Sequence, residues 1–346
     1  MCVVAVTDTD VVTKVEVAGY VSNHKGLNLP GVAVSVPALS EKDREDLRWA
    51  IKIGADLIAL SFVRNADDIN DVHQIMDEAG VRIPVIAKIE KPQAVDNLFD
   101  IVSAFDGIMV ARGDLGVEMP LESVPLAQKR AIELARRQAK PVIVATQVLE
   151  SMIQNPRPTR AEASDCANAI LDGADAVMLS GETSVGAYPI EAVRTMARII
   201  ENVEENGGER IAELGSYPQT RAGALTRAAA EMGEQLDAAY LVTFTQSGDT
   251  ARRLSRLRTT IPLLAFTPLH STRAQLAVSW GVSTYEVPEV KHTDEMVAQV
   301  DELLRAKHLA NEGDTVVIVA GLPPGTPGST NSLRIHTVGE KAIFEH

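Results

Sequence analysis

Residues 83–114 read IPVIAKIEKPQAVDNLFDIVSAFDGIMVARGD, and this stretch decides the fold. It predicts a strand over 83–90, a helix over 91–105 and a second strand over 106–114. Both strand segments are nearly continuous apolar runs, which is typical of a parallel sheet covered on both faces. A strand, a helix and a strand in succession therefore place the chain in the α/β class.

The same alternation continues on both sides of this stretch. We predict three more strands over 55–64, 140–147 and 174–182, so that five parallel strands can be counted. A further helix begins at Ser40, whose hydroxyl can form a capping box with Asp43 or Glu41. The predicted helices outside the opening stretch cover residues 40–54, 65–80, 125–139, 160–173 and 189–207.

A second α/β region follows a linker, which is marked by Gly207, Gly208 and the polar stretch SYPQTRAG at 216–223. Ahead of the first region, the chain start contains short strand segments of a small β-rich unit. We therefore expect three domains, over residues 1–30, 31–206 and 207–346. The predicted strands of the last domain cover 238–245, 261–267, 282–287 and 314–321.

Composition excludes several classes of protein. The net charge of 33 − 47 = −14 argues against nucleic-acid binding, which depends on basic patches. No apolar run approaches the roughly 20 residues that cross a bilayer, and the start MCVVAVTDTD lacks the basic segment of a signal peptide. Cys2 and Cys166 suggest no disulfide framework. We expect a cytoplasmic protein that binds neither nucleic acid nor membrane.

Polar side chains stand at the carboxyl ends of the predicted strands, the edge that holds functional residues in parallel α/β folds. With a period of two, Lys88 and Glu90 point to the same side of their strand. A local ion pair would explain them, but a charge pair in an apolar strand is costly without a function. Asp114 follows Gly113 at the next strand end. It is either a functional carboxylate or simply the aspartate of a turn.

Glu90 and Asp114 together supply two carboxylates from neighbouring strands. Hard oxygen ligands of this kind suit Mg²⁺ or Mn²⁺ with open positions for substrate oxygens. Lys88 beside such an ion would stabilise negative charge on an enolate oxygen and on a transferring phosphoryl group. These three residues therefore form the candidate catalytic and metal site.

Three hydroxyl residues stand at the remaining strand ends. Thr146 is expected on the same face as Val142 and Val144, at the mouth of the site. Ser61 and Ser180 end the first and the fifth strand. Each of the three is a weak signal alone and gains weight only from its neighbours.

The last domain contains a candidate site of its own. Residues 243–250, TFTQSGDT, join a predicted strand to a helix, where hydroxyls and backbone N–H groups can cradle a phosphate. A well-capped helix without a ligand explains the same spacing equally well. The candidate phosphate-binding residues are Thr245, Gln246, Ser247, Gly248 and Thr250.

Taken together, these motifs resemble pyruvate kinase of the bacterial type. The resemblance runs from about residue 20 to the end of the chain. It implies a (β/α)₈ TIM barrel, a β-rich lid inserted after the third strand and a C-terminal α/β regulatory domain. The motifs that carry it are GLNLPG (26–31), SFVR (61–64), IPVIAKIEKPQAV (83–95), MVARGDLGVE (109–118), VIVATQVLESM (142–152) and PRPTRAEASDCANAILDGADAVMLSGET (156–183).

The resemblance implies a reaction and a role for each site residue. Phosphoenolpyruvate would give its phosphoryl group to ADP in glycolysis, leaving pyruvate and ATP. Glu90 and Asp114 would ligate the divalent metal, and Lys88 would stabilise the phosphoryl and enolate charge. Thr146, with the backbone N–H groups of Gly113 and Asp114, would hold the substrate carboxylate. Thr146 would also help to deliver a proton to the enolate carbon.

The same resemblance implies further partners. Lys25 in NHKG would reach the nucleotide phosphate from the lid, and the 243–250 loop would bind a phosphorylated allosteric effector. Asp249 stands where a basic residue often helps to hold a bisphosphate, so a sugar monophosphate or AMP is favoured over fructose bisphosphate. The assembly would be a homotetramer, with the helices after strands six to eight at one interface.

A closed barrel needs eight strands, and only five are countable. By the resemblance, three strands and most of the lid come first in the family, and with them the arginine that grips the phosphoryl group and the K⁺ ligands. None of these can be assigned to residues of this chain. We therefore expect a partial barrel in an N-terminally truncated chain, the remnant of a lid over 1–30 and impaired turnover.

Two alternatives stay open on the sequence. One is another metal-dependent enolate enzyme on a similar barrel, such as a lyase, since its carboxylate pair would look alike. The other is a catalytically inactive fragment that binds an effector or other subunits.

Overall fold

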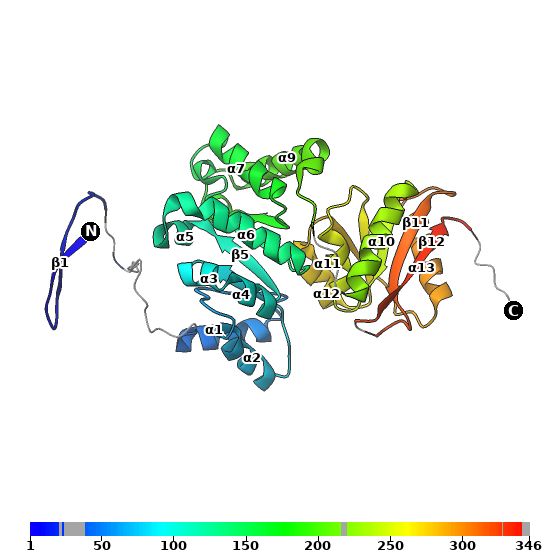
Figure 1. Ribbon diagram of the computed structural model, residues 1–346, viewed down its shortest axis with the longest axis horizontal. Helices are drawn as coiled ribbons and strands as arrows, with labels where there is room; N and C mark the ends of the chain where they lie inside the picture. Colours follow the sequence, from blue (N-terminus) through cyan, green and yellow to red (C-terminus); the bar gives the residue numbers. More distant parts are fainter. Residues whose placement is uncertain (21–22, 24–38, 216–219, 327, 341–346) are drawn as a thin grey trace. The chain divides into compact units, whose positions relative to one another are not determined.

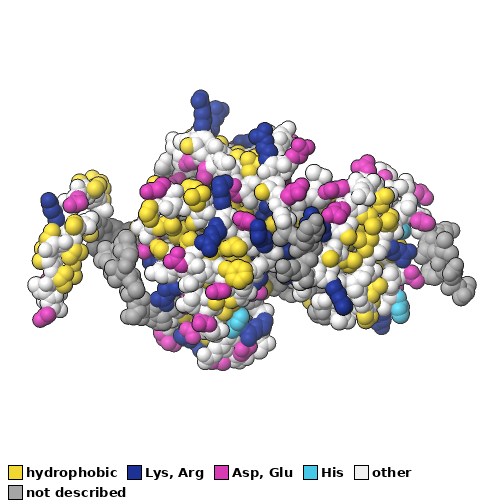
Figure 2. All heavy atoms as spheres, in the orientation of Figure 1, with side chains coloured by type: hydrophobic (Ala, Val, Ile, Leu, Met, Phe, Trp, Pro, Cys, Tyr) yellow, Lys and Arg dark blue, Asp and Glu magenta, His cyan; other side chains and the backbone are white. Residues whose placement is uncertain are grey.

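The computed structural model describes residues 1–20, 23, 39–215, 220–326 and 328–340. The chain divides into two compact units, Met1–Ala33 and Val34–His346. In the first unit β1 (Cys2–Val6) pairs with β2 (Val11–Lys14) as an antiparallel hairpin. Its valines are exposed, and Figure 2 shows hydrophobic side chains on the surface of this hairpin, so the described part of the unit buries no core of its own.

The second unit begins with a five-stranded parallel sheet in the order β3-β4-β5-β6-β7, labelled in part in Figure 1. This confirms the α/β class and the parallel sheet. Alternate residues of a strand serve its two faces: Val85 and Ala87 pack in the large core under the helices, whereas Ile86 faces the opposite side. The strands are β3 (Ile58–Leu60), β4 (Val85–Ile89), β5 (Gly107–Ala111), β6 (Val142–Ala145) and β7 (Ala176–Met178).

Helices alternate with these strands. The expected capping box at the first helix is present, because Ser40 Oγ accepts a hydrogen bond from the N–H of Asp43 while the Asp43 side chain accepts from the N–H of Ser40. The helices are α1 (Glu41–Lys52), α2 (Asp68–Glu78), α3 (Pro92–Asp96), α4 (Leu98–Ala104), α5 (Arg112–Glu118), α6 (Val124–Arg137), α7 (Arg160–Leu171), α8 (Gly181–Ser184) and α9 (Pro189–Gly207). Short 3₁₀ turns cover η1 (Leu121–Ser123), η2 (Glu150–Ile153) and η3 (Gly208–Arg210).

Two predicted elements differ from the structure. The helix expected over 91–105 is divided into α3 and α4 at Asn97, whose side-chain amide donates to the carbonyl of Arg64. The strand expected over 106–114 ends at Ala111, and α5 begins at the next residue. The helical turn places Leu115 in a fully buried position against Val124. The Arg-Gly-Asp motif therefore opens a short helix instead of ending a strand.

The C-terminal part of the same unit contains a second five-stranded sheet in the order β10-β9-β8-β11-β12. The four predicted strands are present and pair in parallel, whereas β12 is antiparallel to β11 and was missed. The strands are β8 (Tyr240–Phe244), β9 (Leu263–Thr267), β10 (Val282–Glu286), β11 (Thr315–Gly321) and β12 (Thr330–Thr337), and the helices are α10 (Arg221–Gln235), α11 (Asp249–Ser255), α12 (His270–Gln275), η4 (Leu276–Val278) and α13 (Thr293–Ala306).

The two sheets of this unit are joined through buried cations. The guanidinium of Arg136 on α6 donates to the carbonyls of Ala212 and Arg256. From the C-terminal side, Arg258 donates to the carbonyl of Gly173 and pairs with Asp175 at 3.0 Å. Among the described helices, none combines the length and the apolar character that a membrane span requires.

Candidate active site

The end of β4 carries an ammonium and a carboxylate in direct contact. Lys88 Nζ lies 2.6 Å from Glu90 Oε1. The Glu90 side chain is only 1% exposed, whereas that of Lys88 is 25% exposed. This contact confirms that the two side chains share one side of the strand, as the two-residue period predicts. A buried carboxylate is thus held beside a cation that still reaches solvent.

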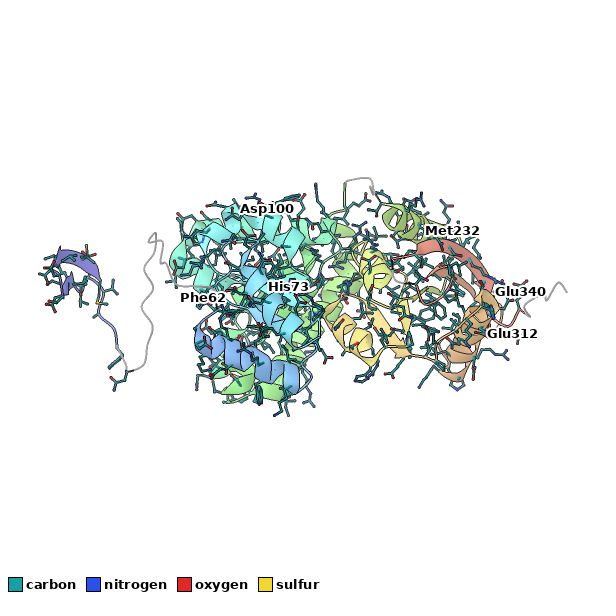
Figure 3. The ribbon with its side chains drawn as sticks, turned by 90° about the horizontal axis from the view of Figure 1, so that it is seen from below. Phe62, His73, Asp100, Met232, Glu312 and Glu340 are labelled. Carbon is teal, nitrogen blue, oxygen red and sulfur yellow. The ribbon has the colours of Figure 1, made fainter. Side chains whose placement is uncertain are left out.

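The loop after β3 completes this group. Lys88 Nζ donates to Ser61 Oγ at 3.0 Å, and the backbone N–H of Phe62 donates to Glu90 Oε2 at 2.6 Å. Phe62 has a φ of 56°, a left-handed conformation that directs its N–H at the carboxylate. Its ring is half-exposed, and Lys91 Nζ lies 5.5 Å from the ring centre. In Figure 3 Phe62 lies on the side away from the C-terminal sheet.

The turn after β5 adds the second carboxylate. Asp114 is exposed in the first turn of α5, and it makes no hydrogen bond or ion pair with the residues that the structure describes. Register pairs Ile89 with Val110, so β4 and β5 end side by side. The far end of α5 is fixed to the β4 loop by the ion pair of Lys91 with Glu118, at 2.7 Å.

Thr146 lies at the end of β6, in a conformation that its sequence does not predict. Its φ is +65°, and that of Gln147 is +53°. A left-handed φ at a β-branched residue is strained and costs on the order of 1–3 kcal/mol. The strand alternation that was expected to put Thr146 on the face of Val142 therefore stops at Ala145, and that expectation is wrong.

Hydrogen bonds fix this strained turn. Thr146 Oγ1 accepts from the N–H of Gly113 at 2.8 Å and donates to the carbonyl of Ala145 at 2.7 Å. The guanidinium of Arg112 donates to the carbonyls of Thr146 and Gln147. The predicted residues Gly113 and Thr146 are therefore in contact, through the same N–H group that was assigned to the substrate carboxylate.

The donor set fits a small divalent cation. Glu90 uses each carboxylate oxygen once, so lone pairs remain, and the carboxylate of Asp114 is open to solvent. Among the described residues no group of three or more His, Cys, Asp or Glu side chains gathers around a point. Two carboxylates nevertheless suffice for Mg²⁺, which keeps several waters and binds substrate oxygens.

The sequence also predicts Lys25 and Ser180 at this site. Lys25 lies outside the described residues, as does the GLNLPG motif at 26–31. Ser180 lies after the end of β7, immediately before α8, and its N–H donates to the buried carboxylate of Glu182 at 2.8 Å. Glu182 also accepts from the N–H of Leu149 at 3.1 Å, so it braces the loop that follows Thr146.

The 243–250 loop joins β8 to α11, as predicted. Gly248 has a φ of +79° at the helix start, and its N–H donates to Thr245 Oγ1 at 2.9 Å. Thr250 Oγ1 lies 2.7 Å from Thr330 Oγ1 on β12. The Ser247 hydroxyl forms no hydrogen bond with a described residue. A ligand that binds the Ser247 hydroxyl therefore displaces no hydrogen bond among the described residues.

A cavity of about 60 Å³ opens beside this loop. Among its described lining residues are the carboxylates of Asp249 and Glu289, and no lysine or arginine. Asp249 is itself paired with Arg253 at 2.6 Å. A ligand in this cavity would meet backbone and hydroxyl groups instead of cations.

Sequence reasoning missed two residues of the candidate active site. They are Arg112 at the start of α5 and its partner Asp165 on α7, and Arg112 Nη1 contacts both carboxylate oxygens of Asp165 at 2.8 and 2.6 Å. Because Arg112 also bonds to the turn after β6, the pair joins α5, α7 and that turn. Arg112 could have been found from the sequence, because it precedes Gly113 at the predicted strand end. Asp165 could not, because it lies in the middle of a helix and 53 positions further along the chain.

Comparison with known proteins agrees with this geometry. The barrel domain of pyruvate kinase matches residues 1–193, and the pyruvate kinase alpha/beta domain matches residues 223–336. The pyruvate kinase of Mycobacterium tuberculosis is 60% identical over 339 residues, which cover 98% of this chain and 72% of that protein. The pyruvate kinase of Corynebacterium glutamicum is 57% identical over 97% of this chain and 70% of its own.

These similarities decide between the open alternatives. A match to the pyruvate kinase barrel domain, followed by a match to its C-terminal domain, favours the kinase over another enolate enzyme on a similar fold. Identity of 57–61% over nearly the whole chain does not favour an inactive binding module. The chain therefore belongs to the pyruvate kinase family, the phosphotransferases that transfer a phosphoryl group from phosphoenolpyruvate to ADP and release pyruvate and ATP.

Proposed function

We propose that this reaction takes place at the carboxyl edge of β3–β6. Glu90 and Asp114 hold Mg²⁺ or Mn²⁺, which when bound supplies positive charge beside the phosphoryl and enolate oxygens. Lys88 adds a fixed ammonium to the same region. The bond from the enol oxygen to phosphorus breaks, a bond from the terminal ADP oxygen to phosphorus forms, and the enolate of pyruvate remains.

Thr146 acts on that enolate. Its hydroxyl delivers a proton toward the methylene carbon, and with the N–H groups of Gly113 and Asp114 it holds the substrate carboxylate. In the ligand-free site Thr146 Oγ1 accepts from Gly113 N–H, so the carboxylate replaces that contact when it binds. The single observation that carries the proposal is the contact of Lys88 with the buried carboxylate of Glu90, at the same sheet edge as the Gly113–Thr146 contact.

The metal ligands are tested by Glu90→Gln and Asp114→Asn. Each change removes one anionic oxygen donor, so we expect Mn²⁺ affinity to fall about tenfold or more, with pyruvate formation falling in parallel. Electron paramagnetic resonance of free Mn²⁺ measures binding without turnover. The matched control is Asp100→Asn on α4, an exposed carboxylate labelled in Figure 3, which should bind Mn²⁺ like the parent. Unchanged affinity in both site variants contradicts the metal assignment.

The role of Lys88 is separable from metal binding. Lys88→Met removes the ammonium but keeps an unbranched chain, so Mn²⁺ should still bind while kcat falls about 100-fold or more. The lactate-dehydrogenase-coupled assay measures pyruvate. If Lys88→Met instead loses Mn²⁺ affinity but keeps the parent kcat once metal is bound, Lys88 only orients Glu90, and its proposed role in charge stabilisation is wrong.

The wider architecture is part of the same proposal. The five strands β3–β7 are taken as part of a TIM barrel, with domain boundaries at 30/31 and 206/207. The family resemblance further supports K⁺ dependence, a homotetramer and a cytoplasmic location. Sedimentation velocity of the purified chain tests the tetramer directly.

An effector site at the 243–250 loop is supported by the neighbouring cavity and by the Ser247 hydroxyl, which has no hydrogen-bond partner among the described residues. Because two carboxylates and no cation line the described part of that cavity, we favour a sugar monophosphate or AMP over a bisphosphate. Isothermal titration with glucose 6-phosphate, AMP and fructose bisphosphate separates these ligands. Tighter binding of the bisphosphate contradicts this assignment.

A further inference from the structure

The turn at the end of β6 depends on a side chain from a different strand end. Thr146 and Gln147 both adopt left-handed backbone conformations, which neither residue type favours. Such a conformation persists only where the surroundings over-determine it. The groups that hold the turn in place therefore decide where the Thr146 hydroxyl lies.

Arg112 supplies that constraint. Its Nη2 donates to the carbonyl of Thr146 at 2.9 Å and to that of Gln147 at 3.2 Å. Its Nη1 donates to both carboxylate oxygens of Asp165. The Arg112 side chain is only 11% exposed. A planar guanidinium can make all four contacts at once, whereas an ammonium cannot reproduce the two-sided geometry.

Arg112 also helps to place the N–H group of Gly113, the donor in the hydrogen bond to Thr146. Arg112 immediately precedes Gly113, whose N–H donates to Thr146 Oγ1. A side chain attached at Gly113 would approach that oxygen to 3.2 Å, so the main chain at Gly113 lies close against the Thr146 side chain. Arg112 thus links the N–H donors of α5 to the hydroxyl of Thr146 through its main chain and its side chain together.

We propose that Arg112, anchored by Asp165, is a positioning residue for proton delivery by Thr146. The inference rests on the role proposed for Thr146 and adds two residues to the site. Without the guanidinium the turn relaxes toward negative φ, and the hydroxyl leaves its place beside Gly113. Arg112 itself touches neither substrate nor metal in this account.

The first test is Arg112→Lys. We expect kcat for pyruvate formation to fall about 10- to 100-fold, since a misplacement of roughly 1 Å has effects of that order. The KM for ADP should stay within about twofold, because no nucleotide contact changes. Exchange of the pyruvate methyl protons in D₂O, followed by NMR, should slow in parallel with kcat. Arg194→Lys on α9, an exposed arginine paired with Glu191, is the matched control.

A double-mutant cycle separates positioning from a general structural effect. Thr146→Ala should slow turnover, and adding Arg112→Lys should slow it no more than about twofold further, because the arginine then has no hydroxyl to place. Multiplicative losses overturn the inference. Should Arg112→Lys fold poorly by circular dichroism, Asp165→Asn, which loosens the anchor from a 41% exposed position, takes its place in the same cycle.

The outcomes distinguish the two proposals. If Thr146→Ala turns over like the parent, the proposed function of Thr146 fails and the positioning role with it. If Thr146→Ala is slow but Arg112→Lys and Asp165→Asn are not, only the positioning role is wrong.

Discussion

At the scale of single residues, the site depends on buried carboxylates that have different kinds of partner. Glu90 faces the ammonium of Lys88, whereas the partners of Glu182 among the described residues are the backbone N–H groups of Leu149 and Ser180, and Glu182 is 2% exposed. Hydrogen bonds from N–H groups to an ionised carboxylate are stronger than neutral ones. Glu182 therefore fixes the two loops after β6 and β7 relative to each other.

Replacing Glu182 by Gln tests this role. The amide turns a donor toward one of two N–H groups, so we expect a loss of about 1–3 kcal/mol in the free energy of unfolding. Urea denaturation measures it. Glu191→Gln, at an exposed ion pair on α9, should cost less than about 1 kcal/mol. Equal losses in the two variants would mean that Glu182 contributes no more than a surface charge.

The residues of the site differ in how far the sequence could predict them. Lys88 and Glu90 follow from a two-residue strand period, and the structure brings them into contact. The conformation of Thr146 does not follow from any local pattern, because its left-handed backbone is held by Arg112 and Gly113, 34 and 33 positions away. Long-range hydrogen bonds override a local rule at this position.

At the scale of elements, the start of α7 combines a helix cap with a loop anchor. Thr159 and Glu162 form a capping box, and Glu162 also accepts from the N–H and the hydroxyl of Ser151. Burial opposes ionisation of Glu162, but these hydrogen bonds outweigh it and lower its pKa. Because α7 also carries Asp165, the cap helps to place the partner of Arg112.

The pH dependence of that cap is predictable in sign. A lowered folded-state pKa means that ionised Glu162 stabilises the fold above its ordinary value of 4.5, and that this contribution is lost as the pH falls through the lower folded value. Glu162→Gln should therefore lower Tm at pH 7, and the difference from the parent should shrink below about pH 4. Differential scanning calorimetry of the parent and the variant at pH 7 and below about pH 4 measures this difference in Tm. A difference that grows on acidification contradicts the assignment.

Elements with nearly continuous apolar runs were the easiest to predict. The five strands of the first sheet and β8, β9 and β11 of the second are of this kind, whereas β10, VSTYE, was predicted although polar residues interrupt it. Strand β12, TNSLRIHT, alternates polar and apolar residues at the edge of its sheet, which gives a weaker signal. The end of β5 was misplaced because Leu115 extends the apolar pattern into a helical turn.

At the scale of the whole second unit, the two sheets meet through arginines that bond to backbone carbonyls. Arg136 is 4% exposed, and burial and the neighbouring Arg258 lower its pKa to about 10. Every residue has a backbone carbonyl, so the sequence does not indicate which carbonyls accept from these arginines. This junction therefore could not be predicted from the sequence. It couples the catalytic sheet to the sheet that carries the 243–250 loop.

Arg136→Met tests the coupling. The change leaves the carbonyls of Ala212 and Arg256 without their donor, at a cost of about 1–3 kcal/mol for each group. We expect the parent to unfold in a single calorimetric transition and Arg136→Met to unfold in two. Arg198→Met, an exposed position on α9, should keep one transition. One transition at the parent temperature in Arg136→Met would show that the sheets are coupled by other contacts.

The same junction holds one of the two tryptophans of the chain. The indole N–H of Trp280 donates to Glu204 at 2.7 Å, and the guanidinium of Arg258 lies 4.9 Å from the ring centre, whereas Trp49 on α1 is 63% exposed. The protein thus contains a natural fluorophore at the boundary that a signal from the proposed effector site would have to cross. With Trp49 replaced by Phe, intrinsic emission reports that boundary alone, and a red shift marks the moment at which it opens.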